Sequence, residues 1–217
     1  MKIRIKFTKY GMMRFIGHLD MMRYFQKAMR RAEIDIAYSE GFSPHQIMSF
    51  AAPLGVGITS EGEYLDIEVH SSKSSKEALK ALNEVMVEGV EVLEYRELPE
   101  GTKNAMSSVA AADYLVTYKT TGADACKPVF TELSKALLKF YQEQSEILIT
   151  KPTKKGEKVM YLKPLIYELE AVYVKGETGF FMKVCTGSTD NVIPELVLLA
   201  FSDYCKATGA CEFHFEP

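Results

Sequence analysis

The sequence lacks several features that would assign it to a familiar class. It has no apolar run long enough to span a bilayer, and Met1 leads into KIRIKF rather than a signal peptide, so we expect a cytoplasmic protein without a membrane partner. Its four cysteines never form C-x-x-C, which argues against a zinc ribbon, a thioredoxin-like site or an iron–sulfur loop. Signatures of Ser-His-Asp or Cys-His catalysis and of a phosphate-binding P-loop are also missing. We therefore predict no catalytic constellation, no metal and no cofactor.

Acidic residues are scarce at the start of the chain. Before residue 33 there are nine lysines and arginines and a single acid, Asp20, which gives this segment a net charge of +8. The whole chain carries -3, so the remainder carries -11. A basic end on an acidic body suggests a polyanion or an acidic partner surface on one face.

The first half of the chain follows the order β-α-β-β-α-β. Strands are predicted where apolar residues alternate, and helices where they recur every three or four residues. The predicted elements are a strand at Lys2–Tyr10, a helix at His18–Ala32, strands at Gln46–Ala51 and Tyr64–Val69, a helix from Ser74 or Ser75 to Val87, and a strand at Val90–Tyr95. This order is that of the ferredoxin-like split βαβ pattern.

The second half is interpreted as a repeat of that order, although no residue-level repeat is visible. Its predicted elements are strands at Asp113–Lys119 and Ile147–Thr150, extended segments at Val159–Leu162, Ile166–Tyr173 and Phe180–Cys185, helices at Val129–Gln142 and from Asp190 or Asn191 to Tyr204, and a strand at Cys211–Phe215. We therefore predict an α+β fold of two ferredoxin-like halves with antiparallel sheets, residues 1–98 and residues 110–217. Pro99–Asn104 would be a linker or a loop between them.

The first predicted helix carries the best functional signal. Arg23, Lys27, Arg30 and Arg31 fall on one of its faces, with no acid between Arg23 and Ala32. Clustered guanidinium groups suit phosphates, and the nearby aromatic residues Tyr24, Tyr38 and Phe42 could stack on unpaired bases. The same face could instead meet the protein's own acidic body or an acidic protein partner. The pattern favours neither interpretation over the other.

A second group of polar residues could line a pocket. His18 and Asp20 could form an acid–base pair or bind a metal, but a role in helix capping and loop hydrogen bonding is the more common one for such residues. His45 would complete a metal site only if its loop folded back, and no fixed spacing supports this. Ser60 and Glu63 could bind a ligand, or could satisfy the backbone of the adjacent glycine-containing loop.

The segment FIGHLDMMRYFQKAMRRAEIDIAYSEGFSPHQIMSFAAPLGVGITSEGEYLDIEV resembles the radical-SAM-associated (radical-SAM-linked) domain family, whose function is unknown. The similarity is dense over roughly residues 1–70, and weaker but collinear beyond them. Gly17 stands where the family often has serine, and Ser43 where it often has asparagine. The matching positions include His18, Asp20, Arg23, Arg30, Arg31, Tyr38, Ser39, Gly41, Phe42, Pro44, His45, Ser60 and Glu63.

The resemblance implies a domain that is fused to, or encoded beside, a B12-binding radical SAM protein. It supplies no catalytic mechanism. Because this sequence has no cluster-binding cysteine loop, it would be the partner of the radical enzyme rather than the enzyme itself.

We therefore expect a non-catalytic accessory protein that presents RNA, or a ribonucleoprotein, to a radical SAM enzyme. The expected contact residues are Arg14, Arg23, Lys27, Arg30, Arg31, Tyr38, Ser39, Phe42 and His45, with a candidate pocket formed by His18, Asp20, Ser60 and Glu63. One alternative is a protein adaptor whose first helix docks directly on that enzyme. Another is an RNA-modifying or hydrolytic enzyme, in which His18, Asp20 and His45 would have to converge within about 3–4 Å or through one water.

Overall fold

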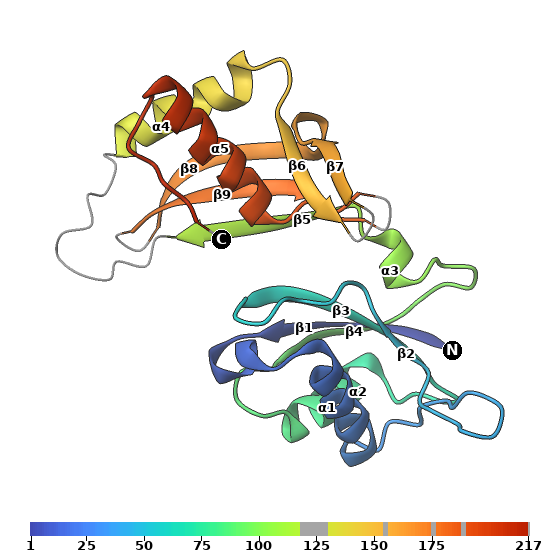
Figure 1. Ribbon diagram of the computed structural model, residues 1–217. Helices are drawn as coiled ribbons and strands as arrows, with labels where there is room; N and C mark the ends of the chain where they lie inside the picture. The colour runs from blue at the N-terminus through green and yellow to red at the C-terminus, as the bar shows by residue number, and fades with distance from the viewer. Residues whose placement is uncertain (118–129, 154–155, 175–176, 188–189, 217) are drawn as a thin grey trace. The chain divides into compact units, whose positions relative to one another are not determined.

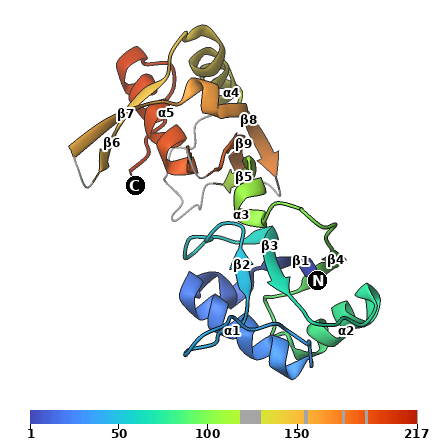
Figure 2. The same cartoon turned by 90° about the vertical axis from the view of Figure 1, so that its right-hand side faces the viewer.

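The computed structural model describes residues 1–117, 130–153, 156–174, 177–187 and 190–216. It confirms an α+β protein with antiparallel sheets. The chain divides into two compact units, Met1–Val109 and Ala110–Pro217 (Figures 1 and 2). None of the helices among these residues is long and apolar enough to cross a membrane.

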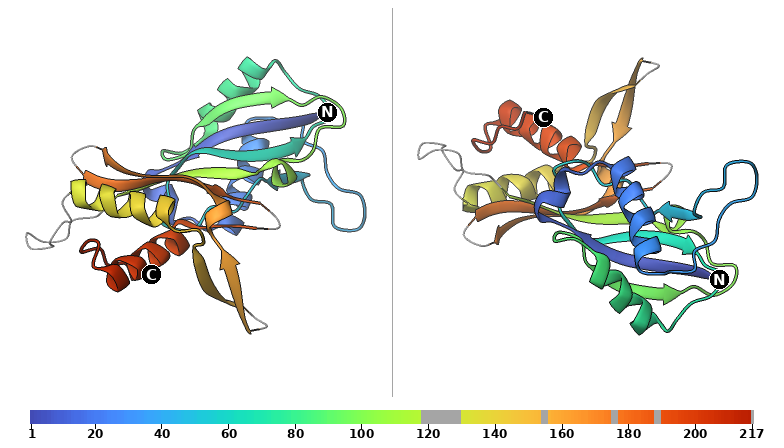
Figure 3. Two further views of the ribbon diagram at one scale, coloured as in Figure 1. Left: turned by 90° about the horizontal axis from the view of Figure 1, so that it is seen from above. Right: turned by 90° about the horizontal axis from the view of Figure 1, so that it is seen from below.

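The first unit is a four-stranded sheet with two helices on one face (Figures 1 and 3). The strand order is β2-β3-β1-β4, and every neighbouring pair is antiparallel. Its elements are β1 (Lys2–Lys9), the short 3-10 helix η1 (Gly11–Phe15), α1 (His18–Arg31), β2 (Met48–Phe50), β3 (Ser60–Glu68), α2 (Ser75–Val85), β4 (Val92–Glu97) and α3 (Ala105–Ser108). The β-α-β-β-α-β order predicted for this half is therefore present.

Both long helices of this unit begin where the sequence provides a start signal. Gly17 is the N-cap of α1, and Asp20 lies in the first turn, where the positive end of the helix dipole favours a carboxylate. Ser74 caps α2 in a reciprocal arrangement with Glu77: each side chain pairs with the backbone N–H of the other residue, at 3.3 and 3.1 Å.

The core of the first unit lies between the sheet and the helices. Alternate residues of β1 point inward, and their register places Ile5 opposite Leu65 and Phe7 opposite Glu63. The Phe7 ring meets the ring of Phe25 from α1 edge-on, with centroids 4.7 Å apart. One face of β1 is thus committed to packing, and its other face carries Lys2, Arg4 and Lys6.

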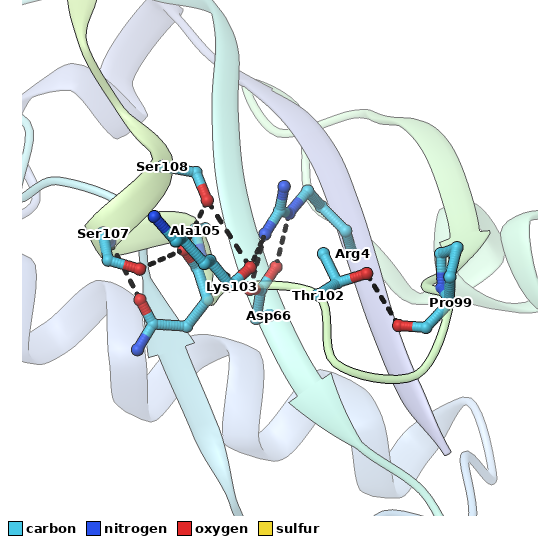
Figure 4. A network of polar contacts seen from close by, with 9 residues as sticks. Arg4, Asp66, Pro99, Thr102, Lys103, Ala105, Ser107 and Ser108 are labelled. Carbon is cyan, nitrogen blue, oxygen red and sulfur yellow. Dashed lines mark hydrogen bonds and ion pairs between the residues drawn. The ribbon is translucent and has the colours of Figure 1, made fainter.

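A hydrogen-bonded network on the outer face of the sheet anchors α3 to the first unit (Figure 4). Arg4 donates from Nε and Nη2 to the two carboxylate oxygens of Asp66, at 2.8 and 3.0 Å. The same Nη2 donates to the Lys103 carbonyl at 3.0 Å, and Ala105 N–H donates to Asp66 at 2.6 Å. The segment between the two predicted halves therefore packs, through Lys103 and Ala105, as part of the first unit.

The second unit combines a three-stranded sheet, in the order β5-β9-β8, with a separate two-stranded ribbon, β6-β7. Figure 1 shows α4 and α5 covering one face of the sheet. The elements are β5 (Ala111–Thr117), α4 (Phe130–Leu138), the π-helical turn η2 (Lys139–Glu143), β6 (Leu148–Thr153), β7 (Gly156–Tyr161), the 3-10 turn η3 (Lys163–Leu165), β8 (Ile166–Val174), β9 (Glu177–Cys185) and α5 (Pro194–Thr208). Pro194 is the first residue of α5, so the helix begins a few residues after the start predicted at Asp190 or Asn191.

The predicted repeat of the ferredoxin-like pattern is not confirmed in the second unit. Its described strands form a sheet and a ribbon rather than one four-stranded sheet. The predicted strand at Cys211–Phe215 is wrong, because this segment is not a strand. Its alternating apolar side chains pack onto the unit's core instead: Phe213 is buried, with ring centroids 5.3 Å from Phe180 and 5.0 Å from Phe201.

Candidate functional site

The basic residues near the N-terminus lie on two separate surfaces of the first unit. One is the outer side of β1, where acidic residues of neighbouring strands lie opposite them. Lys2 pairs with Glu68 at 3.9 Å, and Arg4 forms the two-pronged contact with Asp66. Lys2 and Arg4 are therefore engaged within the protein, and they offer a polyanion less than the sequence suggests.

The other surface is the basic face of α1, formed by Arg23, Lys27, Arg30 and Arg31, all of them exposed. Arg23 pairs with Asp20 at 3.0 Å, and Arg31 donates to the Val85 carbonyl at 3.2 Å. Within the described part of the chain, Lys27 and Arg30 have no carboxylate within 4.0 Å. These two cations are therefore the ones most available to an external anion.

An aromatic side chain is fixed beside this face. Gln46 is buried, and its amide nitrogen donates both to the Gln26 carbonyl of α1, at 3.2 Å, and to the Tyr38 hydroxyl, at 3.3 Å. Tyr38 itself is 47% exposed. The Gln46 side chain thus ties a half-exposed ring to the middle of the helix that carries Lys27 and Arg30.

The loop that follows Tyr38 presents a second aromatic side chain. Its base is closed by Ser39 and His45: Ser39 N–H donates to the His45 carbonyl at 2.8 Å, and the Ser39 hydroxyl lies 2.8 Å from His45 Nδ1 and accepts from His45 N–H at 3.1 Å. Phe42, at the tip, is completely exposed. Figure 1 shows this segment, between α1 and β2, as a long loop standing away from the sheet. Ser39 and His45 therefore shape the loop, and Phe42 is its exposed aromatic side chain.

A small pocket lies at the opposite end of α1, where β1 ends. Its walls are formed by Phe7, Lys9, His18, Met21, Phe50, Ala52, Leu54 and Glu63. It has room for about one water molecule. Lys9 is only 2% exposed and donates to the Ile16 carbonyl at 2.7 Å. The pocket is therefore a small space that buried Lys9 and half-buried Glu63 share with apolar side chains.

Burial shifts both charged residues of this pocket toward their neutral forms. Loss of hydration lowers the pKa of Lys9, an effect that the charge of Glu63 opposes. Loss of hydration raises the pKa of Glu63, opposed by a hydrogen bond from Ser60 and by the charge of Lys9.

The structure brings together some of the predicted pocket residues and separates others. His18 and Glu63 line the pocket, and Ser60 contacts Glu63. Asp20 faces outward toward Arg23. The His18 ring packs against Phe50 at 5.2 Å, whereas His45 precedes Phe50 by five residues of extended chain, roughly 15 Å.

His18, Asp20 and His45 are therefore not assembled into one site, because β2 lies between the two histidines. Among the residues described here, no group of three or more His, Cys, Asp and Glu side chains could hold a metal ion.

Arg14 lies apart from the basic face of α1. It belongs to η1, where its guanidinium lies 4.6 Å from the ring centroid of Phe15 and its carbonyl accepts from Gly57 N–H at 2.8 Å. Arg14 thus connects η1 to the loop between β2 and β3, next to the pocket rather than next to Lys27.

Sequence reasoning overlooked Lys9, although a signal was present. Lys9 has the same parity along β1 as Ile3, Ile5 and Phe7, which all point into the core. A lysine on the apolar row of a strand predicts a buried amine with a specific partner, here the carbonyl of Ile16.

Comparison with known proteins gives a family and no activity. No curated protein matches the chain. A family model described as "Uncharacterized protein conserved in bacteria (DUF2344)" matches residues 2–194, which include the first unit except Met1 and the second unit as far as the start of α5. The chain belongs to this bacterial family.

Proposed function

We propose that this protein is a non-catalytic accessory protein that binds single-stranded RNA, free or within a ribonucleoprotein, through the basic face of α1 and the adjacent Tyr38–His45 loop. One observation carries the proposal: Lys27 and Arg30 have no acidic partner among the described residues, on the helix to which Gln46 ties the Tyr38 ring. Lys2 and Arg4 of β1, by contrast, are already paired with acids.

The chemistry of this surface matches that of an unpaired nucleic acid strand. Cations on successive turns of a helix can follow a phosphate backbone, and exposed aromatic rings can stack on bases. Stacking requires bases that are not enclosed in a duplex, which favours single-stranded regions. Lys27 and Arg30 supply the cations, and Tyr38 and Phe42 supply the rings.

We further propose that the partner of this protein is a cytoplasmic B12-binding radical SAM enzyme. The support is the resemblance of residues 1–70 to radical-SAM-linked domains. In this arrangement, the present chain holds the RNA and the partner carries out the chemistry.

Charge reversal tests the cationic contacts. In the double variant Lys27→Glu/Arg30→Glu, we expect the affinity for a labelled pool of random single-stranded RNA to fall about a hundredfold, and the slope of log K against log salt to become shallower by about 1.4. The matched control is Lys76→Glu/Lys80→Glu, which makes the same change in net charge on exposed positions of α2 and should bind nearly normally. Unchanged affinity in the α1 variant, measured by fluorescence anisotropy, would contradict the proposal.

A second pair of variants tests stacking independently of charge. Tyr38→Leu and Phe42→Ser should each weaken RNA binding about tenfold without changing the salt slope, because each removes a ring and no charge. Tyr38→Phe keeps the ring but loses the hydroxyl that accepts from Gln46, so it should lose less affinity than Tyr38→Leu. Tyr64→Leu removes an exposed tyrosine from the outer face of the sheet and should have no effect. Equal losses in the Tyr64 and Tyr38 variants would argue against a specific stacking surface.

A protein adaptor is the second candidate, favoured by exposed apolar residues near the start of α1. Met12 is 78% exposed, Phe15 50% and Leu19 62%. A tagged pull-down, divided into nuclease-treated and untreated halves, separates the two functions. A discrete RNA whose removal also removes the protein partners supports RNA binding. A radical SAM protein that survives nuclease, with no RNA enriched, supports the adaptor.

A further inference from the structure

Two cysteines of the second unit lie in contact with each other. Cys205 is in the last turn of α5, and Cys211 is in the segment that follows the helix; their sulfur atoms are 3.2 Å apart. Cys205 is only 2% exposed, whereas Cys211 is half-buried. Sulfur atoms in a disulfide are separated by about 2.05 Å, so a shift of roughly 1 Å would allow a bond to form.

The fold holds these sulfur atoms together from both sides. Gly209 ends α5 with φ +65°, a left-handed conformation that suits glycine, and its N–H donates to the Cys205 carbonyl at 2.8 Å. The chain then returns along the helix, where Phe213 is buried and Phe215 N–H donates to the Ser202 hydroxyl at 3.1 Å. Cys211 therefore lies between two anchored points, and its position beside Cys205 follows from the packing of the whole segment.

We propose that Cys205 and Cys211 form a reversible redox site, in which hydrogen peroxide converts the two thiols into an intramolecular disulfide. The Cys211 sulfur attacks one peroxide oxygen, the O–O bond breaks, and Cys211 becomes a sulfenic acid as one water leaves. The Cys205 sulfur then attacks the Cys211 sulfur, the S–O bond breaks, and a second water leaves with the proton from Cys205. Two thiols and one peroxide thus give one disulfide and two waters, and a dithiol reductant reverses the change.

The two cysteines differ in environment, and the difference assigns their order. Cys211 is the more exposed and meets peroxide first. Burial, reinforced by the neighbouring Cys211, raises the pKa of Cys205 to about 12, so Cys205 remains a thiol at neutral pH and reacts slowly with peroxide itself. Its role is to capture the sulfenic acid beside it.

Another cysteine provides a matched control. Cys185 is half-buried like Cys211, but its sulfur lies 3.5 Å from the Asp190 carbonyl, and no described cysteine lies within bonding reach of it. Cys126 is outside the described residues. Peroxide should therefore leave Cys185 without a disulfide partner.

The consequence of the bond is local. It would tie the C-terminal segment covalently to α5, in a part of the chain that lies beyond the family-matched residues 2–194. Opening of that segment would then depend on the thiol redox state. Neither Lys27 nor Arg30 takes part, so this site is independent of the proposed RNA surface.

Peptide mapping tests the proposal on the full chain. The folded protein is treated with dilute hydrogen peroxide, quenched with catalase, alkylated in denaturant and digested with trypsin. Cleavage after Lys206 places Cys205 and Cys211 in different peptides. The expected result is a linked pair of these peptides with two hydrogens lost, which separates on treatment with dithiothreitol. Cys185→Ser should give the same link, and Cys211→Ser should give none.

Two results would overturn the proposal. One is Cys211 recovered as sulfinic acid while Cys205 remains free to be alkylated. The other is a disulfide between Cys205 and Cys211 that forms as fast in urea as in the folded protein. The fold holds the two sulfur atoms together, so it should accelerate this bond about tenfold over the unfolded chain. Circular dichroism provides the folding control for Cys211→Ser. If its spectrum and melting temperature match those of the natural protein, the absence of the link in this variant does not result from unfolding.

Discussion

The outer row of β1 and the basic face of α1 contain similar residues and behave differently. On β1, Lys2 and Arg4 lie opposite Glu68 and Asp66 of the neighbouring strand. On α1, Lys27 and Arg30 face solvent without a carboxylate partner in the described chain. A basic segment in a sequence can therefore be neutralised by acids more than sixty positions away. Only the part that remains unpaired is available for recognition.

Burial also distinguishes the paired cations of β1 from the unpaired cations of α1. The side chains of Arg4 and Asp66 are 22% and 13% exposed, and the hydrogen bonds to Asp66 raise the pKa of Arg4, opposed in part by its burial. A charge pair in that environment stabilises the fold mainly because either partner would be costly to leave alone. The cations of α1 have no such role, so their removal should cost little stability. The two rows thus separate folding from binding within one unit.

The largest expected effect is on stability, and it comes from removing the acidic partner of Arg4 on β1. Asp66→Asn removes a carboxylate that accepts from Arg4 Nε, Arg4 Nη2 and the Ala105 N–H. We expect a loss of about 3 kcal/mol in the free energy of unfolding, measured in urea, with RNA affinity of the folded protein unchanged. Glu94→Gln, which breaks the exposed pair with Arg96, should cost less than about 0.5 kcal/mol. Equal losses from these two variants would remove the distinction between buried and exposed pairs.

A smaller effect is expected from Glu63, a half-buried acid at the end of the same sheet. The pKa of Glu63 is raised in the folded protein, so above the ordinary glutamate value of about 4.3 the folded state binds more protons than the unfolded state. The contribution of Glu63 to stability is therefore greatest at low pH and decreases as the pH rises through the raised pKa.

Glu63→Gln should remove this decrease in stability with rising pH. At pH 7, its free energy of unfolding should exceed that of the natural protein by on the order of 1 kcal/mol. Thermal unfolding at a series of pH values between about 4 and 8 measures it. Glu61→Gln, at an exposed position of the same strand, is the control. A pH profile that is parallel in all three proteins would show that Glu63 titrates as an ordinary surface acid.

Local features of this fold could be predicted, because they depend on neighbouring residues. Gly17 and Ser74 mark the starts of their helices, and apolar spacing gives the extent of α1 to within one residue. The order of elements in the first unit follows from the same patterns. In the second unit, the alternation in Cys211–Phe215 suggested a strand, but its side chains pack onto a core beside α5. Alternation indicates which residues are buried, and it does not specify what buries them.

The candidate site was harder to predict, because it depends on contacts between distant parts of the chain. No pattern near Tyr38 indicates that the buried amide of Gln46 would tie it to Gln26. The sequence also could not show that Arg4 is paired and Lys27 is not. Lys9, however, could have been found from its parity in β1. Charge and aromatic content thus predicted a helix and a loop as the binding surface, while pairing across the sheet shows which basic residues already have an acidic partner.

The smallest expected effect concerns the one acid on the basic face of α1. Asp20 pairs with Arg23 at 3.0 Å, and both side chains are largely exposed. Asp20→Asn would release Arg23 and remove a negative charge, so RNA affinity should rise about two- to threefold at low salt and return to the natural value at high salt. The free energy of unfolding should fall by about 0.5 kcal/mol, because the helix dipole favours a carboxylate in the first turn of α1. Glu84→Gln makes the same change in charge on α2 and should leave RNA affinity unaltered. If both variants bind RNA more tightly to the same extent, the gain reflects net charge alone. A gain in affinity confined to Asp20→Asn would show that an acidic partner keeps a basic side chain of this unit from binding RNA. The same rule would then hold for the basic side chains of α1 and for those of β1.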